Sequence, residues 1–220
     1  MIELKRVSKN YGHKVIFDNL SLTLESGKLI ALVGPSGAGK TTLLNLIGLL
    51  DLDYKGKILV DGIDTKTLNS KQRMLFIRNR INYLFQDYAL VENLTVKDNL
   101  LLALEYCKMS KNEKLQEITQ ALDKVDLSES FDHKVYELSG GEQQRVALAR
   151  TMIKPGKIIL ADEPTGNLDE ANKQKVFTLL ESLKSPDRTI IIVTHDKQLA
   201  GSSDLVITLN DELFMRQDMK

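Results

Sequence analysis

The sequence predicts an α/β protein with a parallel sheet at its core and an all-helical insertion. Short apolar runs that end in polar residues recur along the chain, at Leu29–Val33, Asn82–Phe85, Lys157–Leu160 and Thr189–Val193. Helix-like stretches separate these runs, which is typical of strands in a parallel sheet buried on both faces. The segment 87–154, by contrast, has helical periodicity and no strand-like run.

Length and composition are consistent with one large α/β domain or a core with a small insert, at 220 residues and 42% hydrophobic residues. Lys and Arg total 30 and Asp and Glu also total 30, which argues against a strongly basic nucleic-acid module. Cys107 is the single cysteine, so an internal disulfide is excluded and a reducing compartment is favoured. No secretion signal and no run of about 20 apolar residues is present, so we expect any membrane connection to run through a partner.

The N-terminal part predicts an antiparallel ribbon. Apolar residues alternate in Ile2–Val7 and again in Val15–Leu24, with a turn at Tyr11-Gly12 between them. A further strand is expected at Tyr54–Asp61, where Asp61-Gly62 forms a turn pair.

Residues 34–41, GPSGAGKT, fit the pattern G-x-x-x-x-G-K-[ST] of a phosphate-binding loop. The apolar run Leu29–Val33 precedes them and the helix-forming Thr42–Leu50 follows, which is the strand–loop–helix setting that this motif requires. Glycines let backbone N–H groups approach phosphate oxygens, and the helix N-terminus adds partial positive charge. Lys40 would reach the β- and γ-phosphates and the Thr41 hydroxyl would hold Mg²⁺. A plain glycine turn before a helix is the disfavoured alternative.

The rest of the chain predicts mainly helices. They are expected at Ser70–Arg78, Thr95–Tyr106, Lys111–Val125 and Glu170–Ser182, with last strands at Leu205–Leu209 and Leu213–Met215. We therefore divide one domain, 1–220, into a catalytic core with a β subdomain, 1–86 and 155–220, and a helical subdomain, 87–154.

Polar residues follow the ends of four predicted strands: Gly34, Gln86, Asp162-Glu163 and His195. Ligands bind outside the carboxyl ends of strands in open parallel sheets, so we expect these residues to meet at one edge. One carboxylate of the acidic pair can serve Mg²⁺ and the other can polarise an attacking water. Solvated turn acids, a structural histidine and an ordinary loop glutamine are the alternatives for these positions.

The hexapeptide 138–143, LSGGEQ, has two compatible interpretations. Ser139 and Glu142 form an S-x-x-E capping box that starts a helix through Met152. The box does not explain Gly140-Gly141, which would expose backbone N–H groups at the helix N-terminus as a second anion site. Two anion-binding helix ends in one chain suggest a pair of chains, each closing the other's nucleotide site.

These motifs resemble those of the nucleotide-binding subunit of an ATP-binding cassette (ABC) transporter, over essentially the whole length. The similar segments, in order, are GPSGAGKT, Gln86 within YLFQD, LSGGEQQRV, IILADE, GNLD and THD. The resemblance implies a P-loop NTPase (RecA-like) core with an N-terminal antiparallel β subdomain and an inserted all-helical subdomain. The implied ligands are ATP and Mg²⁺.

By this resemblance, Glu163 would be the general base, His195 would hold the γ-phosphate, and Gln86 would touch Mg²⁺ or the attacking water and sense the membrane partner. Mg²⁺ would be held by Thr41, Gln86 and Asp162. Nucleotide would be bound by Tyr11, which stacks on adenine, by Gly34, Pro35, Ser36, Gly37, Ala38, Gly39, Lys40, Thr41 and Thr42, and, across a dimer interface, by Ser139, Gly140, Gly141 and Asp169. A surface tyrosine at Tyr11 and a helix-start aspartate at Asp169 are the alternatives, and Asn167-Leu168 would lie beside Asp169 at that interface.

The segments IGLLD, GEQQRVALAR and ADEPTGNLD resemble the macrolide-export and lipoprotein-release branch, the MacB and LolD relatives. This implies an ATPase that dimerises on ATP and drives a separate membrane permease at the cytoplasmic face of the membrane. The implied role is export or resistance of the peptide/bacteriocin, macrolide or lipoprotein type, without nucleic acid. A soluble ABC ATPase acting on ribosomes or DNA is less favoured, because the chain has one signature, no heptad run and balanced charge. A regulatory module without turnover is disfavoured by Glu163 and His195.

Overall fold

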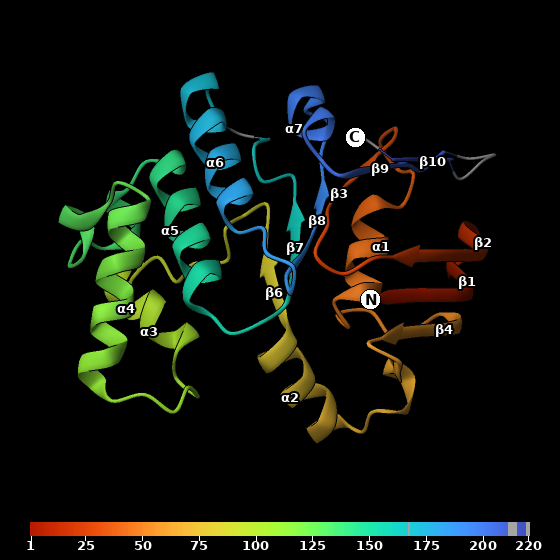
Figure 1. The fold of residues 1–220 in the computed structure, drawn as a ribbon, viewed down its shortest axis with the longest axis horizontal. Coiled ribbons are helices and arrows are strands. Elements are labelled where there is room, and N and C mark those ends of the chain that lie inside the picture. The colour runs from red at the N-terminus through yellow and green to blue at the C-terminus, as the bar shows by residue number, and fades with distance from the viewer. Residues whose placement is uncertain (167, 211–214, 219–220) are drawn as a thin grey trace.

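The computed structural model describes residues 1–166, 168–210 and 215–218. A six-stranded sheet of order β10-β9-β3-β8-β7-β6 lies at the centre of the molecule (Figure 1). Its strands pair in parallel, except that β10 runs antiparallel to β9. The bounds are β3 Leu29–Val33, β6 Ile81–Leu84, β7 Ile158–Asp162, β8 Thr189–Val193, β9 Leu205–Thr208 and β10 Met215–Asp218.

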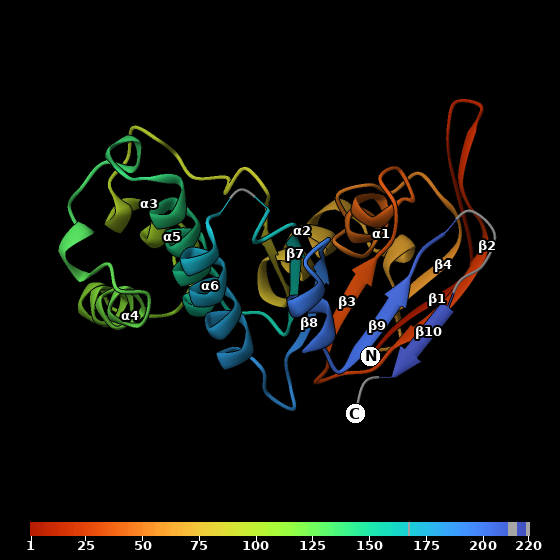
Figure 2. The ribbon, with the colours of Figure 1, turned by 90° about the horizontal axis from the view of Figure 1, so that it is seen from above.

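A second sheet, antiparallel and of order β2-β1-β4-β5, lies to the right of the central sheet in Figures 1 and 2. Its strands are β1 Ile2–Tyr11, β2 Lys14–Leu24, β4 Lys55–Val60 and β5 Ile63–Asp64. The pairing of β1 with β2 begins at Ile2 and Leu24 and shifts register three times before Tyr11 meets Lys14. The predicted antiparallel ribbon is therefore confirmed, with three register shifts between Leu4 and Asn10.

Seven α-helices are present among the described residues: α1 Lys40–Ile47, α2 Ser70–Arg80, α3 Val96–Ala103, α4 Lys111–Lys124, α5 Gly140–Ile153, α6 Glu170–Ser182 and α7 Lys197–Gly201. Short 3₁₀ turns add 65–67, 128–130 and 135–137. None of these helices is long and apolar enough to cross a membrane.

Three hydrophobic clusters hold these layers together. One joins α1 and the antiparallel sheet to one face of the central sheet, and another packs α5 and α6 on the opposite face. The third lies among α3, α4 and α5, at the far left of Figures 1 and 2. Every residue of β7 and β8 is buried, which explains why their sequences are apolar without alternation.

The predicted α/β class is confirmed, and β3, α6 and β8 have the bounds that the sequence predicts. Several ends differ: α3 stops at Ala103 instead of Tyr106, and β7 begins at Ile158 and runs on through Asp162. The sequence also gave no indication of β5 or α7. Leu213 and Phe214 of the last predicted strand lie outside the described residues, and the domain boundaries at 86/87 and 154/155 stay predictions.

Two glycines of the antiparallel sheet offer a matched test of this packing. Gly56 and Gly62 both have left-handed backbone, with φ of +87° and +78°. A Cβ at Gly56 would lie 2.1 Å from the carbonyl oxygen of Arg6, whereas a Cβ at Gly62 would meet nothing within 4 Å. We expect Gly62→Ala to lower the free energy of unfolding by about 1–2 kcal/mol, from the left-handed backbone alone. Gly56→Ala should cost about 3 kcal/mol or more, because the β1 bulge has to move. Urea denaturation measures both, and equal losses would contradict the close approach of β1 and β4.

Candidate functional site

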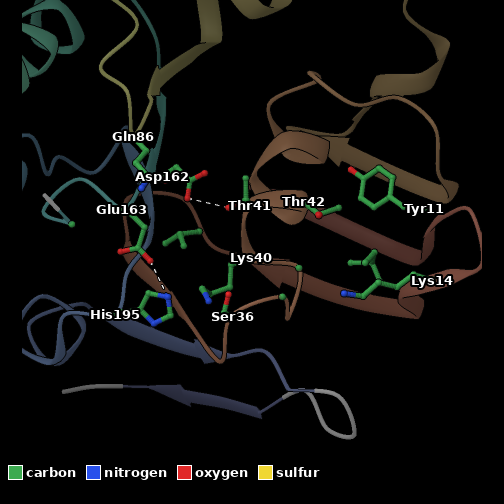
Figure 3. A pocket seen from close by; sticks show the side chains of 15 residues that line it. Tyr11, Lys14, Ser36, Lys40, Thr41, Thr42, Gln86, Asp162, Glu163 and His195 are labelled. Atoms are coloured by element: carbon green, nitrogen blue, oxygen red, sulfur yellow. Dashed lines mark hydrogen bonds and ion pairs between the residues drawn. The ribbon is translucent and has the colours of Figure 1, made fainter.

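A cavity of about 670 Å³ opens at the carboxyl edge of the parallel sheet (Figure 3). Predicted site residues at its wall are Tyr11, Ser36, Gly37, Gly39, Lys40, Thr41, Thr42, Gln86, Asp162, Glu163 and His195. They come from β1, from the loop and helix after β3, and from the ends of β6, β7 and β8. The structure therefore brings together, at one edge, polar residues that are far apart in the sequence. Gly34, Pro35 and Ala38 belong to the same loop but do not line this cavity.

The loop between β3 and α1 has the backbone of a phosphate cradle. Gly37 and Gly39 have φ of +83° and +89°, and α1 starts directly after Gly39 without a side-chain cap. A Cβ at Gly39 would lie 2.6 Å from Cγ2 of Ile16 and 2.8 Å from the ring of Phe17, so β2 leaves room for glycine alone. The first N–H groups of a helix have no intrahelical partner and favour an anion. This geometry fits a bound phosphate group.

Lys40 is buried, and its ammonium lies over the carbonyl groups of its own loop. Its Nζ donates hydrogen bonds to the carbonyl oxygens of Gly34, at 2.8 Å, and Pro35, at 2.9 Å. The ammonium is thus held inside the cradle, near the two acids at the end of β7, Asp162 and Glu163. Burial raises the pKa of both Asp162 and Glu163, and the charge of Lys40 opposes that rise at each of them.

Thr41 and Asp162 present two oxygen atoms side by side. The Thr41 hydroxyl donates to Oδ1 of Asp162 at 3.2 Å (Figure 3). Burial raises the pKa of the Asp162 carboxyl, against the opposing effects of this hydrogen bond and of Lys40. Mg²⁺ prefers oxygen ligands and is usually held by one or two protein groups together with substrate phosphates. A hydroxyl and a buried carboxylate beside a phosphate cradle fit that ion.

Glu163 and His195 form a second pair across the pocket floor. Nε2 of His195 lies 3.2 Å from Oε1 of Glu163. The Glu163 side chain is only 17% exposed and the His195 side chain 58%. Burial raises the pKa of Glu163, while the charge and backbone N–H of His195 and the charge of Lys40 oppose the rise. A carboxylate with a raised pKa is a stronger base, so this arrangement can accept a proton from a nearby water.

The backbone of Glu163 is strained, and one hydrogen bond holds it in that conformation. Its φ is +46°, which is uncommon for a non-glycine residue, and its N–H donates to the carbonyl oxygen of Val193 at 3.0 Å. The bond to the end of β8 holds Glu163 next to the strand that leads to His195. Strain of this kind persists only where the surroundings fix it, and it clusters at functional sites.

Four residues that sequence reasoning did not select also line the pocket: Lys14, Ile16, Gly166 and Val193. The register of β2 against β1 shifts between the pairs Lys9–Phe17 and Asn10–Val15, and Ile16 falls within that shift. A bulge leaves no trace in the apolar pattern, so the sequence carried no signal for Ile16. Lys14 sits on the Tyr11 side of the pocket, opposite Glu163 and His195 (Figure 3).

Ser139, Gly140 and Gly141 do not line this pocket. The capping box at the start of α5 is confirmed: the Ser139 N–H donates to Oε2 of Glu142 at 2.8 Å, and the Glu142 N–H donates to the Ser139 hydroxyl at 3.4 Å. A Cβ at Gly141 would lie 3.0 Å from Asn172, which itself bonds to Asp169, the N-cap of α6. The serine–glycine helix end and Asp169 are thus neighbours, apart from the pocket. Asn167 lies outside the described residues.

Comparison with known proteins gives a consistent picture. The profile of the ABC transporter family matches residues 17–166. The macrolide export ATP-binding/permease protein MacB of Campylobacter jejuni is 40% identical over 211 residues, which are 96% of this chain and 33% of that protein. An uncharacterized ABC transporter ATP-binding protein of Methanocaldococcus jannaschii, MJ1508, is 37% identical over 96% of both chains. The chain thus spans about a third of the length of its macrolide-export relatives.

Solved structures agree in fold. A dimeric structure of the ATP-binding cassette MJ0796, in a post-hydrolysis state with ADP and Pi, superposes with a TM-score of 0.91 at 33% identity, over 100% of this chain and 99% of that one. A second dimeric structure of the same cassette also gives 0.91, at 35% identity. The chain therefore belongs to the ABC transporter family, as an ATP-binding subunit of the MacB/LolD type with ATPase activity.

Proposed function

We propose that this subunit powers a separate membrane permease, and that two copies bind two ATP molecules head to tail and complete each other's sites. The observation that carries the proposal is the division of the motifs. The pocket gathers Lys40, Thr41, Asp162, Glu163 and His195, whereas the Ser139 helix end lies outside it. A second copy would bring that helix end to the open side of the pocket.

Binding begins with the phosphates. The loop from Gly34 to Thr42 wraps the β- and γ-phosphates, and Lys40 exchanges its carbonyl partners for phosphate oxygens. Tyr11 lies on the opposite side of the pocket from Glu163 (Figure 3), where its ring stacks on adenine. Thr41, Asp162 and Gln86 would hold Mg²⁺, and that ion would supply charge neutralisation at the phosphate oxygens.

Hydrolysis then needs a positioned water and a base. Glu163 takes a proton from the water while the water oxygen bonds to the γ-phosphorus. The bond between the γ-phosphorus and the β–γ bridging oxygen breaks at the same time. ADP keeps that oxygen and its electron pair, and inorganic phosphate leaves. His195, which is held 3.2 Å from Glu163, contacts the γ-phosphate. Positioning and charge neutralisation supply most of the rate enhancement in phosphoryl transfer.

The second copy supplies Ser139, Gly140 and Gly141 to the γ-phosphate, with Asp169 at the interface. The dimeric MJ0796 cassettes support this arrangement, because they share the fold over the full length of this chain. Closure on ATP and reopening after hydrolysis would then be a cycle of dimer association. Such a cycle couples chemistry to movement without any change in the fold of one copy.

The permease would dock near Gln86–Val91, over the helical subdomain that we assign to 87–154. Val91 is an exposed apolar residue there, and Gln86 joins this segment to the nucleotide pocket. The macrolide-export relatives are named ATP-binding/permease proteins, which supports a permease partner, a place at the cytoplasmic face of the membrane and a role in export or resistance. Nucleic acid has no part in this proposal.

Glu163→Gln tests the base. The amide keeps the size of the side chain but cannot accept the proton, so ATP binding should persist while phosphate release falls by about a hundredfold or more. Light scattering after gel filtration should then find an ATP-trapped dimer. Glu170→Gln, which changes an exposed acid at the start of α6, is the control and should hydrolyse ATP normally. Full turnover by Glu163→Gln would exclude Glu163 as the base.

Protein concentration tests the shared site. If a site needs two copies, phosphate release per chain should be very low in dilute protein and rise steeply as the concentration increases. Steady-state phosphate release, measured beside light scattering on the same samples, checks this dependence. A rate per chain that stays constant down to concentrations where only monomers scatter would contradict the head-to-tail arrangement.

Comparison of two capping boxes of the same kind can show whether Ser139 only caps its helix or also binds the nucleotide. Ser110 and Glu113 start α4 with the same reciprocal bonds that Ser139 and Glu142 make at α5. Either serine replaced by alanine should lower the free energy of unfolding by about 1 kcal/mol. Only Ser139→Ala should also reduce phosphate release, by about tenfold, because a hydrogen bond to a charged phosphate is lost. Equal activity of the two variants at matched folded concentration would leave Ser139 as a cap alone.

A further inference from the structure

We infer that Asp51 and Lys9 are positioning residues for nucleotide binding: they fix the Tyr11 ring in the orientation that receives the adenine base. This inference rests on the proposed role of Tyr11. Neither Asp51 nor Lys9 lines the pocket, so each would act through Tyr11 and not on the nucleotide itself.

Tyr11 would be a poor stacking platform without support. It is the last residue of β1, next to the turn into β2, and it is 49% exposed. An exposed ring at a strand end can rotate, and that freedom has to be lost before a base can stack on it. Its hydroxyl, however, donates to Oδ2 of Asp51 at 2.9 Å. The ring is therefore held at both ends, by the backbone of β1 and by this hydrogen bond.

Lys9 holds Asp51 in turn and also contacts the ring. Its side chain is only 2% exposed, and its Nζ lies 2.9 Å from Oδ2 of Asp51 and 2.6 Å from the carbonyl oxygen of Asp53. The same Nζ lies 4.5 Å from the centroid of the Tyr11 ring, within the range of a cation–π contact. The ammonium thus limits how the ring can tilt.

The Asp51 carboxylate bonds to Lys9, to Tyr11 and to the backbone of Asp53. Its Oδ1 also accepts the N–H of Asp53 at 2.9 Å, so both oxygens are occupied. Burial would raise the pKa of Asp51, but the bonds from Lys9, the Asp53 N–H and the Tyr11 hydroxyl together hold it below its ordinary value. Asp51 consequently stays ionised as a strong acceptor for the Tyr11 hydroxyl at neutral pH.

Asp51 is anchored to the helix that begins at the phosphate loop. Its N–H donates to the carbonyl oxygen of Asn45 in the last turn of α1 at 3.2 Å, and the Leu50 N–H donates to the same oxygen at 2.9 Å. α1 starts at Lys40 and Thr41, so one rigid helix carries the phosphate cradle at its N-terminus and the support of Tyr11 at its C-terminus. The distance between the base site and the phosphate site is therefore set by a helix and not by a loop.

The buried Lys9–Asp51 pair also joins β1 to the segment after α1, and a purely structural role would predict a loss of stability alone. The two roles differ in what they do to ligands. Positioning of the ring affects ligands that carry adenine and leaves bare phosphates unaffected. ADP and pyrophosphate, neither of which this enzyme would hydrolyse further, provide that comparison.

The experiment is calorimetric titration of the full chain with Mg-ADP and with Mg-pyrophosphate. Tyr11→Phe keeps the ring and the Lys9–Asp51 pair but removes the hydroxyl, and Asp51→Ala removes the acceptor. Each should weaken ADP binding by about threefold to tenfold, the effect of one hydrogen bond, with pyrophosphate affinity unchanged within about twofold. The double variant should lose no more than Asp51→Ala alone, because the two changes break one interaction.

Two further variants keep the outcomes distinct. Tyr11→Ala removes the ring and should lower ADP affinity more than Tyr11→Phe does; if it does not lower ADP affinity, the adenine role of Tyr11 fails and the inference fails with it. Asp132→Asn breaks the surface ion pair with Lys97 among the helices and should leave both affinities unchanged.

If Tyr11→Ala weakens ADP binding but Tyr11→Phe does not, the inference alone is overturned. The same holds if Asp51→Ala lowers ADP and pyrophosphate affinity equally. Tyr11→Phe decides the matter even if Asp51→Ala does not fold.

Discussion

The nucleotide site depends on one constraint, the fixed position of the backbone where the chain leaves β3. β3 is hydrogen-bonded to β8 on one side and β9 on the other, and these bonds continue past the ends of β8 and β9: the N–H of Thr194 donates to the carbonyl oxygen of Leu32, and the N–H of Leu209 donates to that of Val33. A Cβ at Gly34 would lie 2.1 Å from the carbonyl oxygen of Leu209, so the backbone directly after β9 touches the first residue of the loop. The position of the phosphate cradle is thus fixed by three buried strands before any side chain of the site is considered.

The parts of the fold that the sequence predicted are those whose signals are local. β8 is a run of β-branched residues with every side chain buried, and α6 begins after an aspartate cap, so both have clear ends. The edge that gathers Gln86, Asp162, Glu163 and His195 followed from a topological rule. Ile16 was missed because its place in the pocket depends on a bulge in β2. Asp51 was missed because its contact with Tyr11 joins residues that are forty positions apart. The left-handed backbone of Glu163 was also beyond prediction, since tertiary bonds impose it on a residue with no preference for it.

A strained segment connects the nucleotide pocket with the helix that carries Ser139. After Gln86, Tyr88 and Ala89 both have positive φ, at 62° and 48°. Arg150 of α5 donates to the carbonyl oxygens of both residues, at 2.7 and 2.5 Å, and the Tyr88 hydroxyl approaches the Cβ position of Gly140 to 3.3 Å. The loop that leaves the pocket is therefore held at both ends of α5. Movement of this loop cannot occur without a change in its contacts to α5, which gives the nucleotide pocket and the N-terminus of α5 a physical link within one chain.

The charges of the pocket explain why the acids need a cation. Burial raises the pKa of both Asp162 and Glu163; Thr41 opposes the rise at Asp162, His195 opposes it at Glu163, and the charge of Lys40 opposes it at both. One ammonium therefore bonds to two loop carbonyl groups and also acts through its charge on both carboxylates. When it turns to a triphosphate, the carboxylates lose part of that compensation while several negative charges are added. In the proposed site, Thr41 and Asp162 would hold a divalent ion, which would compensate the charge of one acid, and Glu163, beside His195, would remain the base. The geometry thus gives two adjacent residues of one strand end different partners, Thr41 for Asp162 and His195 for Glu163, as the proposed roles of metal ligand and proton acceptor require.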